Sequence, residues 1–156
     1  MNEITIPNFA TLQLQHIVLD YNGTIAQDGV LKESVKKAIN ELCKNFTIHI
    51  ITADTFGSVS KQSENLKITL KILSSNDHTQ EKADYLQRLG AQNCVAIGNG
   101  NNDKKMLQSA ALGIAVTGEE GCATQTLMAS DIVCRCIENA LELLEKPKRM
   151  IATLRK

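Results

Sequence analysis

The chain has no surplus of charge of either sign. Its 156 residues include 17 Lys and Arg and 17 Asp and Glu, so the formal net charge is zero. Proteins that bind nucleic acid mainly through phosphate contacts gather a basic surplus on one face. The balance of charges therefore argues against a nucleic-acid partner.

Long apolar runs are also lacking. No stretch approaches the roughly 20 apolar residues of a membrane-spanning helix, so we expect no membrane partner. The opening Met1-Asn2-Glu3 does not have the basic and then apolar pattern of a secretory signal. The cysteines are odd in number, five in all, which argues against a disulfide framework. These features lead us to expect a cytoplasmic protein.

No linker, low-complexity tract or internal repeat interrupts the sequence, and we expect a single domain over residues 1–156. Extended segments alternate with helical ones, which predicts a three-layer α/β fold with a doubly wound, mostly parallel sheet. The expected strands after the N-terminal segment are Phe46–Thr52, Leu66–Leu73, Cys94–Ile97, Leu112–Val116 and Asp131–Cys134. The expected helices are Leu31–Asn45, Thr55–Asn65, His78–Leu89, Asp103–Ala110, Gly121–Ala129, Ile137–Leu144 and a last one from Pro147 to Leu154.

The N-terminal segment predicts a β-hairpin that leads into the first core strand. Ile4–Pro7 and Thr11–Leu19 are both extended in pattern, and Asn8-Phe9-Ala10 connects them. Farther on, the connection from Asp20 to Thr52 has room for one turn and one helix only. We therefore expect no inserted cap domain.

Polar residues follow several of the expected strands. Asp20 ends the first core strand, Thr52 ends the next, and Gly98-Asn99-Gly100-Asn101-Asn102-Asp103 follows the strand Cys94–Ile97, while Lys82 lies early in a helix. In a parallel sheet such groups meet at the carboxyl edge. An aspartate can attack phosphorus to give an acyl phosphate, and Mg²⁺ prefers hard oxygen ligands of this kind. A lysine and a threonine can hold phosphoryl oxygens.

Four motifs in this order resemble those of the haloacid dehalogenase superfamily of aspartate-nucleophile hydrolases. They are Asp20-Tyr21-Asn22-Gly23-Thr24, Ile50-Ile51-Thr52, Lys82 and the Gly98–Asp103 stretch. The chain is most similar to the soluble, capless branch that resembles P-type ATPases. The later run from Gly98 to Val133, which includes Gly113-Ile114-Ala115-Val116 and Ala129-Ser130-Asp131-Ile132-Val133, is similar to the phosphorylation domain of those pumps.

The resemblance implies a role for each motif. Asp20 would be the nucleophile. Thr52 and Lys82 would bind phosphate, together with the backbone at Gly23 and Ala53. The implied cofactor is Mg²⁺, held by Asp20, the backbone carbonyl of Asn22 and the last motif with Asn99 and Asp103. The implied substrate is a small phosphorylated compound or a phosphoprotein.

Two positions depart from the common pattern of that superfamily. Most of its phosphatases have an aspartate where Asn22 stands, which acts as general acid and base, and an amide cannot shuttle a proton. Asn99 stands where a metal-binding aspartate is usual, so one negative charge is missing from the cation site. For Asp103 two roles remain open: binding the metal through water, or orienting Lys82.

Two functions of different classes follow. The first is a magnesium-dependent phosphohydrolase or phosphotransferase that is slow at its second step, because Asn22 offers no base. The second is a binding or regulatory module of the same fold that has lost catalysis and acts through a partner or through self-association. Capless members often use a neighbouring subunit as a lid, which makes a homo-oligomer an expectation. A dinucleotide fold is disfavoured because the spaced GxGxxG pattern is lacking.

Overall fold

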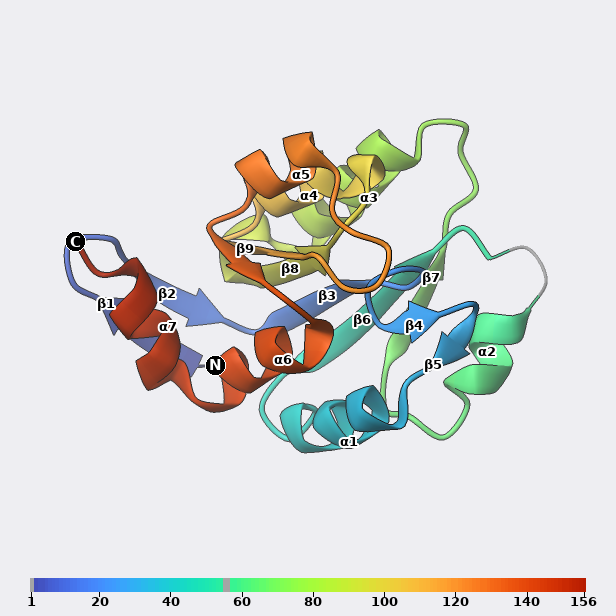
Figure 1. The fold of residues 1–156 in the computed structure, drawn as a ribbon, viewed down its shortest axis with the longest axis horizontal. Helices are drawn as coiled ribbons and strands as arrows, with labels where there is room; N and C mark the ends of the chain where they lie inside the picture. The colour runs from blue at the N-terminus through green and yellow to red at the C-terminus, as the bar shows by residue number, and fades with distance from the viewer. Residues whose placement is uncertain (1, 55–56) are drawn as a thin grey trace.

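The computed structural model describes residues 2–54 and 57–156, and a parallel β-sheet lies at its centre (Figure 1). Six strands form this sheet in the order β10-β9-β8-β3-β6-β7, and every neighbouring pair is parallel. The expected α/β architecture with a parallel sheet is confirmed. The strands are β3 (His16–Asp20), β6 (Thr47–Thr52), β7 (Thr69–Ile72), β8 (Cys94–Gly98), β9 (Leu112–Val116) and β10 (Ile132–Cys134).

The path of the chain through this sheet reverses direction once. From β3 it proceeds to β6 and β7 on one side, and then crosses to β8, β9 and β10 on the other. The strands β3 and β8 are hydrogen-bonded neighbours at the point of reversal, with Leu19 paired to Ile97. In open α/β sheets, ligands bind outside the carboxyl ends of the strands at such a point. The topology therefore directs attention to the ends of β3 and β8.

Helices cover both faces of the sheet (Figure 1). One face is covered by α1 (Glu33–Leu42) and α6 (Ile137–Glu145), whose apolar residues share a cluster with Ile17 and Leu19 of β3. The other face is covered by α3 (His78–Leu89) and α4 (Lys104–Ser109), and α5 (Thr124–Ala129) lies beside α4. The sheet is thus the middle of three layers.

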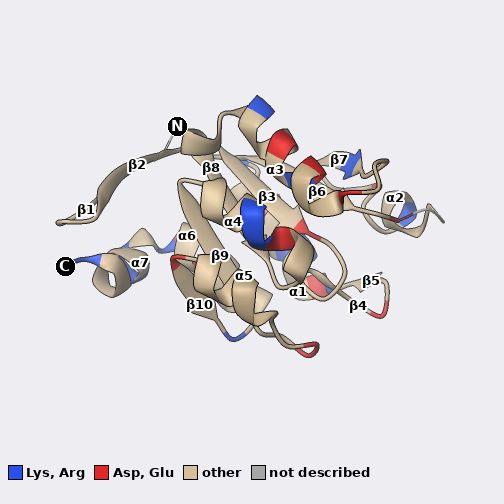
Figure 2. Ribbon diagram, turned by 90° about the horizontal axis from the view of Figure 1, so that it is seen from above, with Lys and Arg blue, Asp and Glu red and all other residues tan. Residues whose placement is uncertain are grey.

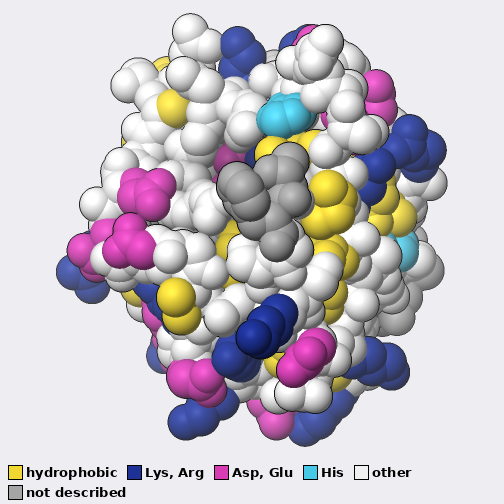
Figure 3. Space-filling view, turned by 90° about the vertical axis from the view of Figure 1, so that its right-hand side faces the viewer, with side chains coloured by type: hydrophobic (Ala, Val, Ile, Leu, Met, Phe, Trp, Pro, Cys, Tyr) yellow, Lys and Arg dark blue, Asp and Glu magenta, His cyan; other side chains and the backbone are white. Residues whose placement is uncertain are grey.

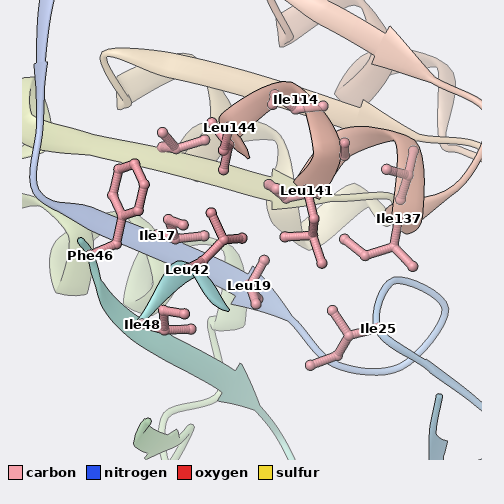
Figure 4. Packing of buried hydrophobic residues seen from close by; sticks show 14 of the residues in the cluster. Ile17, Leu19, Ile25, Leu42, Phe46, Ile48, Ile114, Ile137, Leu141 and Leu144 are labelled. Atoms are coloured by element: carbon pink, nitrogen blue, oxygen red, sulfur yellow. The ribbon is translucent and has the colours of Figure 1, made fainter. Parts of the chain in front are cut away.

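The central strands are buried on both faces, which explains their nearly continuous apolar sequences. All five residues of β8 and of β9 are buried, and in β3 only His16 is partly exposed. Figure 4 shows Ile17 and Leu19 of β3 packed among Leu42, Leu141 and Leu144 from the helices. Strands held in this way give the groups at their ends a fixed position.

The helix that carries Lys82 has well-defined ends. Asp77 precedes α3, and its side chain accepts a hydrogen bond from the backbone N–H of Gln80 at 3.0 Å, which caps the first turn. Gly90 ends α3 in a left-handed conformation with φ of 90°. The bounds of this helix, His78–Leu89, are those expected from the sequence.

Several predicted boundaries were wrong. The run Thr11–Leu19 is divided into β2 (Ala10–Leu14) and β3, because β2 pairs with β1 (Asn2–Ile6) in a separate antiparallel hairpin and only β3 enters the main sheet. The N-terminal hairpin itself is confirmed. The predicted helix Thr55–Asn65 corresponds to the shorter α2 (Ser58–Gln62), and its first two residues lie outside the described part of the chain.

The segment after Thr24 holds an element that the sequence did not predict. A small antiparallel hairpin, β4 (Ala26–Gln27) and β5 (Val30–Leu31), stands where a plain loop was expected. Asp28 and Gly29 form its turn with positive φ values of 51° and 80°. Other predicted helices are shorter at their ends: α1 begins at Glu33 and α5 at Thr124.

The last helix is α7 (Pro147–Leu154). It starts at Pro147 as predicted and packs against β1. None of the helices in residues 2–54 and 57–156 is both long and apolar enough to cross a membrane. Figure 2 shows Lys and Arg interspersed with Asp and Glu along the chain, so no strongly basic face is visible in that view.

Candidate active site

Asp20 lies at the carboxyl end of β3, at the centre of the sheet. Its backbone is paired with Ile51 of β6, and its side chain is largely buried, with 7% of the residue exposed. The next residue, Tyr21, is buried and starts a tight turn, because its carbonyl accepts hydrogen bonds from the N–H groups of Thr24, Ile25 and Ala26. A carboxylate is therefore held at the point where the sheet topology predicts a ligand site.

Lys82 reaches this carboxylate from the adjacent helix α3. Its Nζ donates a hydrogen bond of 2.7 Å to Oδ1 of Asp20 and a second of 2.7 Å to Oδ1 of Asp103. A third bond, of 3.1 Å, goes to Oδ1 of Asn102. The lysine is 1% exposed, so its charge is almost fully removed from water and is balanced by these partners.

Asp103 is completely buried, and both of its carboxylate oxygens are engaged. Oδ1 pairs with Lys82, and Oδ2 accepts hydrogen bonds from the backbone N–H groups of Asn99 at 3.1 Å and Gly100 at 3.0 Å. Gly98 makes room for this carboxylate: a Cβ there would lie 2.5 Å from Cγ of Asp103. Of the two roles left open for Asp103, the contacts favour holding Lys82.

Thr24 joins the first motif to the last one. Its hydroxyl lies 3.0 Å from Oδ2 of Asp20 and 3.2 Å from Oδ1 of Asn99, and the residue is 4% exposed. A hydroxyl has a single hydrogen to donate, so it can satisfy only one of these two oxygens at a time. One oxygen at the ends of β3 and β8 is therefore left as an acceptor for another group.

The charges in this cluster do not balance. Asp20 and Asp103 face one Lys82, which leaves one negative charge in excess when all three groups are ionised. Burial, and after it the negative charge of Asp103, raise the pKa of Asp20 to about 7, although the Lys82 ammonium opposes both. Burial alone would lower the pKa of Lys82, but its two carboxylate partners raise it above the ordinary value.

The oxygen atoms beside Asp20 suit a hard divalent cation. The Asp20 carboxylate and the Asn99 amide oxygen converge on one hydroxyl that cannot satisfy both, and a cation would offset the excess negative charge. The backbone carbonyl of Asn22 belongs to the same turn. No group of three or more His, Cys, Asp or Glu that could hold a metal occurs in the described residues. This agrees with an amide at position 99 and with Asp103 turned towards Lys82.

Thr52 and Ala53 lie at the end of β6, next to β3. Thr52 is buried, and its hydroxyl accepts a hydrogen bond of 3.2 Å from the backbone N–H of Asp54. Ala53 is exposed. No hydrogen bond between Thr52 and either Asp20 or Lys82 is found in the described part of the chain. The structure thus places Thr52 at the correct edge of the sheet without joining it to the buried charges.

Asn22 and Gly23 form the rim of the site. Asn22 is exposed, and its backbone makes an isolated bridge to Ala26. Gly23 adopts a positive φ of 78°, which an L side chain rarely adopts, and its N–H donates to the carbonyl of Ala26. Figure 3 shows the face of the molecule where the parallel strands end, and both acidic and basic side chains are exposed on it.

The sequence of this chain is similar to those of known proteins. A family model described as haloacid dehalogenase-like hydrolase matches residues 77–125, the segment that holds Lys82 and Asp103. A probable copper-exporting P-type ATPase of Archaeoglobus fulgidus is 35% identical over 106 residues, which are 67% of this chain and 13% of that protein. The chain belongs to the haloacid dehalogenase superfamily. The predicted resemblance is confirmed at this level.

Two further proteins are similar to this chain, one in sequence and one in structure. An uncharacterised protein of Methanocaldococcus jannaschii is 45% identical over 78 residues, 47% of this chain and 84% of that protein. Among solved structures, the 3-deoxy-D-manno-octulosonate 8-phosphate phosphatase of Moraxella catarrhalis superposes with a TM-score of 0.72 at 20% identity. The match covers 92% of this chain and 94% of that one, and it confirms the fold.

Sequence reasoning missed two contributors to this site of the superfamily fold. The bridging position of Thr24 was not predicted, although its place four residues after Asp20 allows a turn to bring the two together. The contact of Asn102 with Lys82 was also missed. In the sequence, the one sign of this contact is that Asn102 precedes Asp103. The direction of a side chain on a short turn follows no regular periodicity, so it could not be predicted.

Proposed function

We propose that this chain is a magnesium-dependent phosphohydrolase or phosphotransferase that acts through an aspartyl phosphate on Asp20. The observation that carries the proposal is the buried Asp20 carboxylate at the switch point of the sheet, 2.7 Å from the Lys82 ammonium and 3.0 Å from the Thr24 hydroxyl. A solved phosphatase of this fold, from Moraxella catarrhalis, is described with magnesium and phosphate ions bound, which supports the choice of reaction and cofactor.

In the first step a carboxylate oxygen of Asp20 attacks phosphorus, the bond from phosphorus to the leaving oxygen breaks, and an acyl phosphate forms. The Lys82 ammonium lies where it can stay close to the phosphoryl oxygens while their charge shifts. The Thr52 hydroxyl and the backbone at Gly23 and Ala53 would contact the same oxygens. A bound Mg²⁺, held by Asp20, Asn22 and Asn99, would screen the carboxylate from the negative phosphate.

In the second step water attacks the acyl phosphate, which releases inorganic phosphate and restores the Asp20 carboxylate. The attacking water must give up a proton, and the leaving group of the first step must gain one. Asn22 lies at the rim where a base would be useful, but its amide does not ionise near neutral pH and so cannot act as a general acid or base. The acyl phosphate should therefore be long-lived, and transfer to an acceptor other than water would be favoured by that lifetime.

The second candidate function is a binding or regulatory module of the same fold with little or no catalysis. The amides at Asn22 and Asn99 favour it, because each removes a group that the reaction would use. Such a module would act through a partner protein or through self-association. For the enzyme, the substrate would be a small phosphorylated compound or a phosphoprotein, in the cytoplasm, and a second copy of the chain would serve as a lid in a homo-oligomer.

Acid-stable covalent labelling separates the two functions. The wild-type chain and Asp20→Asn are incubated with radiolabelled acetyl phosphate and Mg²⁺, quenched in acid, and assayed for covalent phosphate and for release of inorganic phosphate. The hydrolase predicts label on the wild type that hydroxylamine removes, as an acyl phosphate requires, and none on Asp20→Asn. Equal labelling of the two proteins, or no label on either, would exclude an Asp20 intermediate and favour the binding module.

A further inference from the structure

The loop that follows β9 brings a carboxylate to the rim of the site. This loop, residues 117–123, contains Glu120, whose Oε2 would lie 2.5 Å from a Cβ built on Gly23. The amide Nδ2 of Asn99 would lie 2.7 Å from the same point. The Glu120 carboxylate and the Asn99 amide therefore meet over Gly23, one residue beyond Asn22 and three residues beyond Asp20.

Asn99 holds this loop in place through its amide group. Its side-chain Nδ2 donates a hydrogen bond of 3.1 Å to the carbonyl of Gly121, and its backbone carbonyl accepts one of 2.8 Å from the N–H of Ala123. An aspartate at position 99 could not donate to the Gly121 carbonyl, and its charge would repel Glu120. The amide at position 99 and the carboxylate at position 120 are thus mutually compatible, whereas two acids would not be.

Asp103, which shares Lys82 with Asp20, is not available to a cation. Both of its carboxylate oxygens are engaged, by Lys82 and by backbone N–H groups. Glu120 is exposed at the rim of the same small cleft that Gly23 and Thr24 line, so its carboxylate has access to the turn. Lys32 also lines the cleft, but it pairs with Glu138 at 3.8 Å.

From these contacts we propose that Glu120 supplies to the cation site the negative charge that Asn99 lacks. In this arrangement the carboxylate comes from the loop after β9 instead of from the end of the neighbouring strand β8. The Asn99 side chain holds that loop through its hydrogen bond to Gly121. The proposal rests on the cation site of the proposed function. It concerns which residue of this chain provides the charge, and so it can fail while the aspartyl-phosphate reaction stands.

Binding of Mn²⁺ alone tests the proposal without any substrate. The free Mn²⁺ signal in electron paramagnetic resonance gives the dissociation constant for the full chain, and thermal unfolding shows that each variant is folded. Glu120→Gln should weaken Mn²⁺ binding about tenfold, the lower end of the effect expected when a supporting group of a metal site is lost. Glu119→Gln, the adjacent exposed carboxylate lining the same cleft, is the matched control and should change the constant less than about twofold.

A double variant strengthens the test. Adding Asn99→Asp to Glu120→Gln returns an acid to the end of β8 and should recover most of the lost affinity. Equal dissociation constants for Glu120→Gln and Glu119→Gln would overturn the proposal, and so would a wild-type chain that binds no Mn²⁺. A Glu120-dependent Mn²⁺ site in a chain that never becomes phosphorylated on Asp20 would support this inference and remove the proposed reaction.

Discussion

The Lys82 ammonium and the Asp103 carboxylate form an ion pair of 2.7 Å in which both side chains are buried, 2% and 0% exposed. The lysine comes from α3 and the aspartate from the turn after β8, so the pair fixes a helix against the end of a central strand. Because Asp20 shares the same ammonium, the position of the proposed nucleophile depends on a contact between two other elements.

Removal of Lys82 should therefore destabilise the whole fold. Lys82→Met leaves Asp20 and Asp103 buried without their common partner, and breaking a buried pair in this way costs about 3–5 kcal/mol. Urea unfolding followed by circular dichroism measures the change. The control Lys105→Met removes an exposed lysine from the adjacent helix and should stay within about 0.5 kcal/mol of the wild type. Similar losses in the two variants would show that the buried charges contribute little.

Gly98→Ala should damage the site through a steric contact. The new Cβ would lie 2.5 Å from Cγ of Asp103, so the carboxylate must move from Lys82, at a cost of about 1–3 kcal/mol. The comparison variant is Gly29→Ala, where φ is 80° but nothing lies within 4 Å of the new Cβ. We expect both variants to lose stability in urea unfolding and only Gly98→Ala to lose phosphate incorporation. Normal labelling of Gly98→Ala would contradict the role given to Asp103.

Asn22→Asp should accelerate the loss of phosphate from the labelled chain. The new carboxylate stands at the rim of the site and could take a proton from the attacking water, and general base catalysis is typically worth about 10²- to 10⁴-fold. Single-turnover decay of the acyl phosphate in rapid-quench experiments measures this rate. Gln27→Glu adds the same charge at an exposed position on β4 and should leave the decay unchanged. Unchanged decay in Asn22→Asp would mean that the base comes from elsewhere.

Three side-chain rings, those of His16, His49 and Tyr85, are joined by hydrogen bonds and predict one part of the pH dependence of stability. Nδ1 of His16 lies 3.1 Å from Nε2 of His49, and Nδ1 of His49 lies 2.9 Å from the Tyr85 hydroxyl. Burial, and after it the neighbouring His16, lower the pKa of His49 from 6.5 to about 4. Between these two values the His49 side chain binds a proton in the unfolded chain and not in the folded chain, so the contribution of His49 to stability falls as pH decreases from 6.5 towards 4.

Urea unfolding at pH 7.5 and pH 5 checks this dependence. The raised pKa of Asp20 contributes in the opposite direction over the same range, so the test compares variants. His49→Gln should be more stable at pH 5, relative to its own stability at pH 7.5, than the wild type is, because the group that must stay neutral is gone. His78→Gln, which replaces a partly exposed histidine at the start of α3, should keep the dependence of the wild type. A full acid response in His49→Gln would assign it to other groups.

The sequence was informative where local signals and the topology agreed. The apolar run ending at Asp20 and the glycine-rich turn after Ile97 both predicted strand ends, and a parallel sheet necessarily brings neighbouring ends together. The expected range His78–Leu89 placed Lys82 on a helix with the bounds that the structure shows. These features depend on backbone preferences, which a single sequence carries.

Contacts made by side chains on turns could not be predicted in the same way. Thr24 bridges two motifs that are 75 residues apart, and no periodicity encodes the direction of its hydroxyl. The hairpin β4–β5 has positive φ values at Asp28 and Gly29. An Asp-Gly pair is equally typical of a turn without flanking strands, so the sequence did not distinguish the two. Glu120 carried one usable signal, because it follows β9, the neighbour of β8, and so belongs to the same edge of the sheet.

The last residue of the chain is held against the turn of the N-terminal hairpin, at the side of the molecule opposite the site. Asn8 donates a hydrogen bond of 2.9 Å to the carbonyl of Lys156, and the N–H of Lys156 donates one of 3.1 Å to Pro7 (Figure 1). A surface anchor attached at Lys156 would therefore lie far from Asp20 and leave that edge of the sheet facing solution (Figure 1).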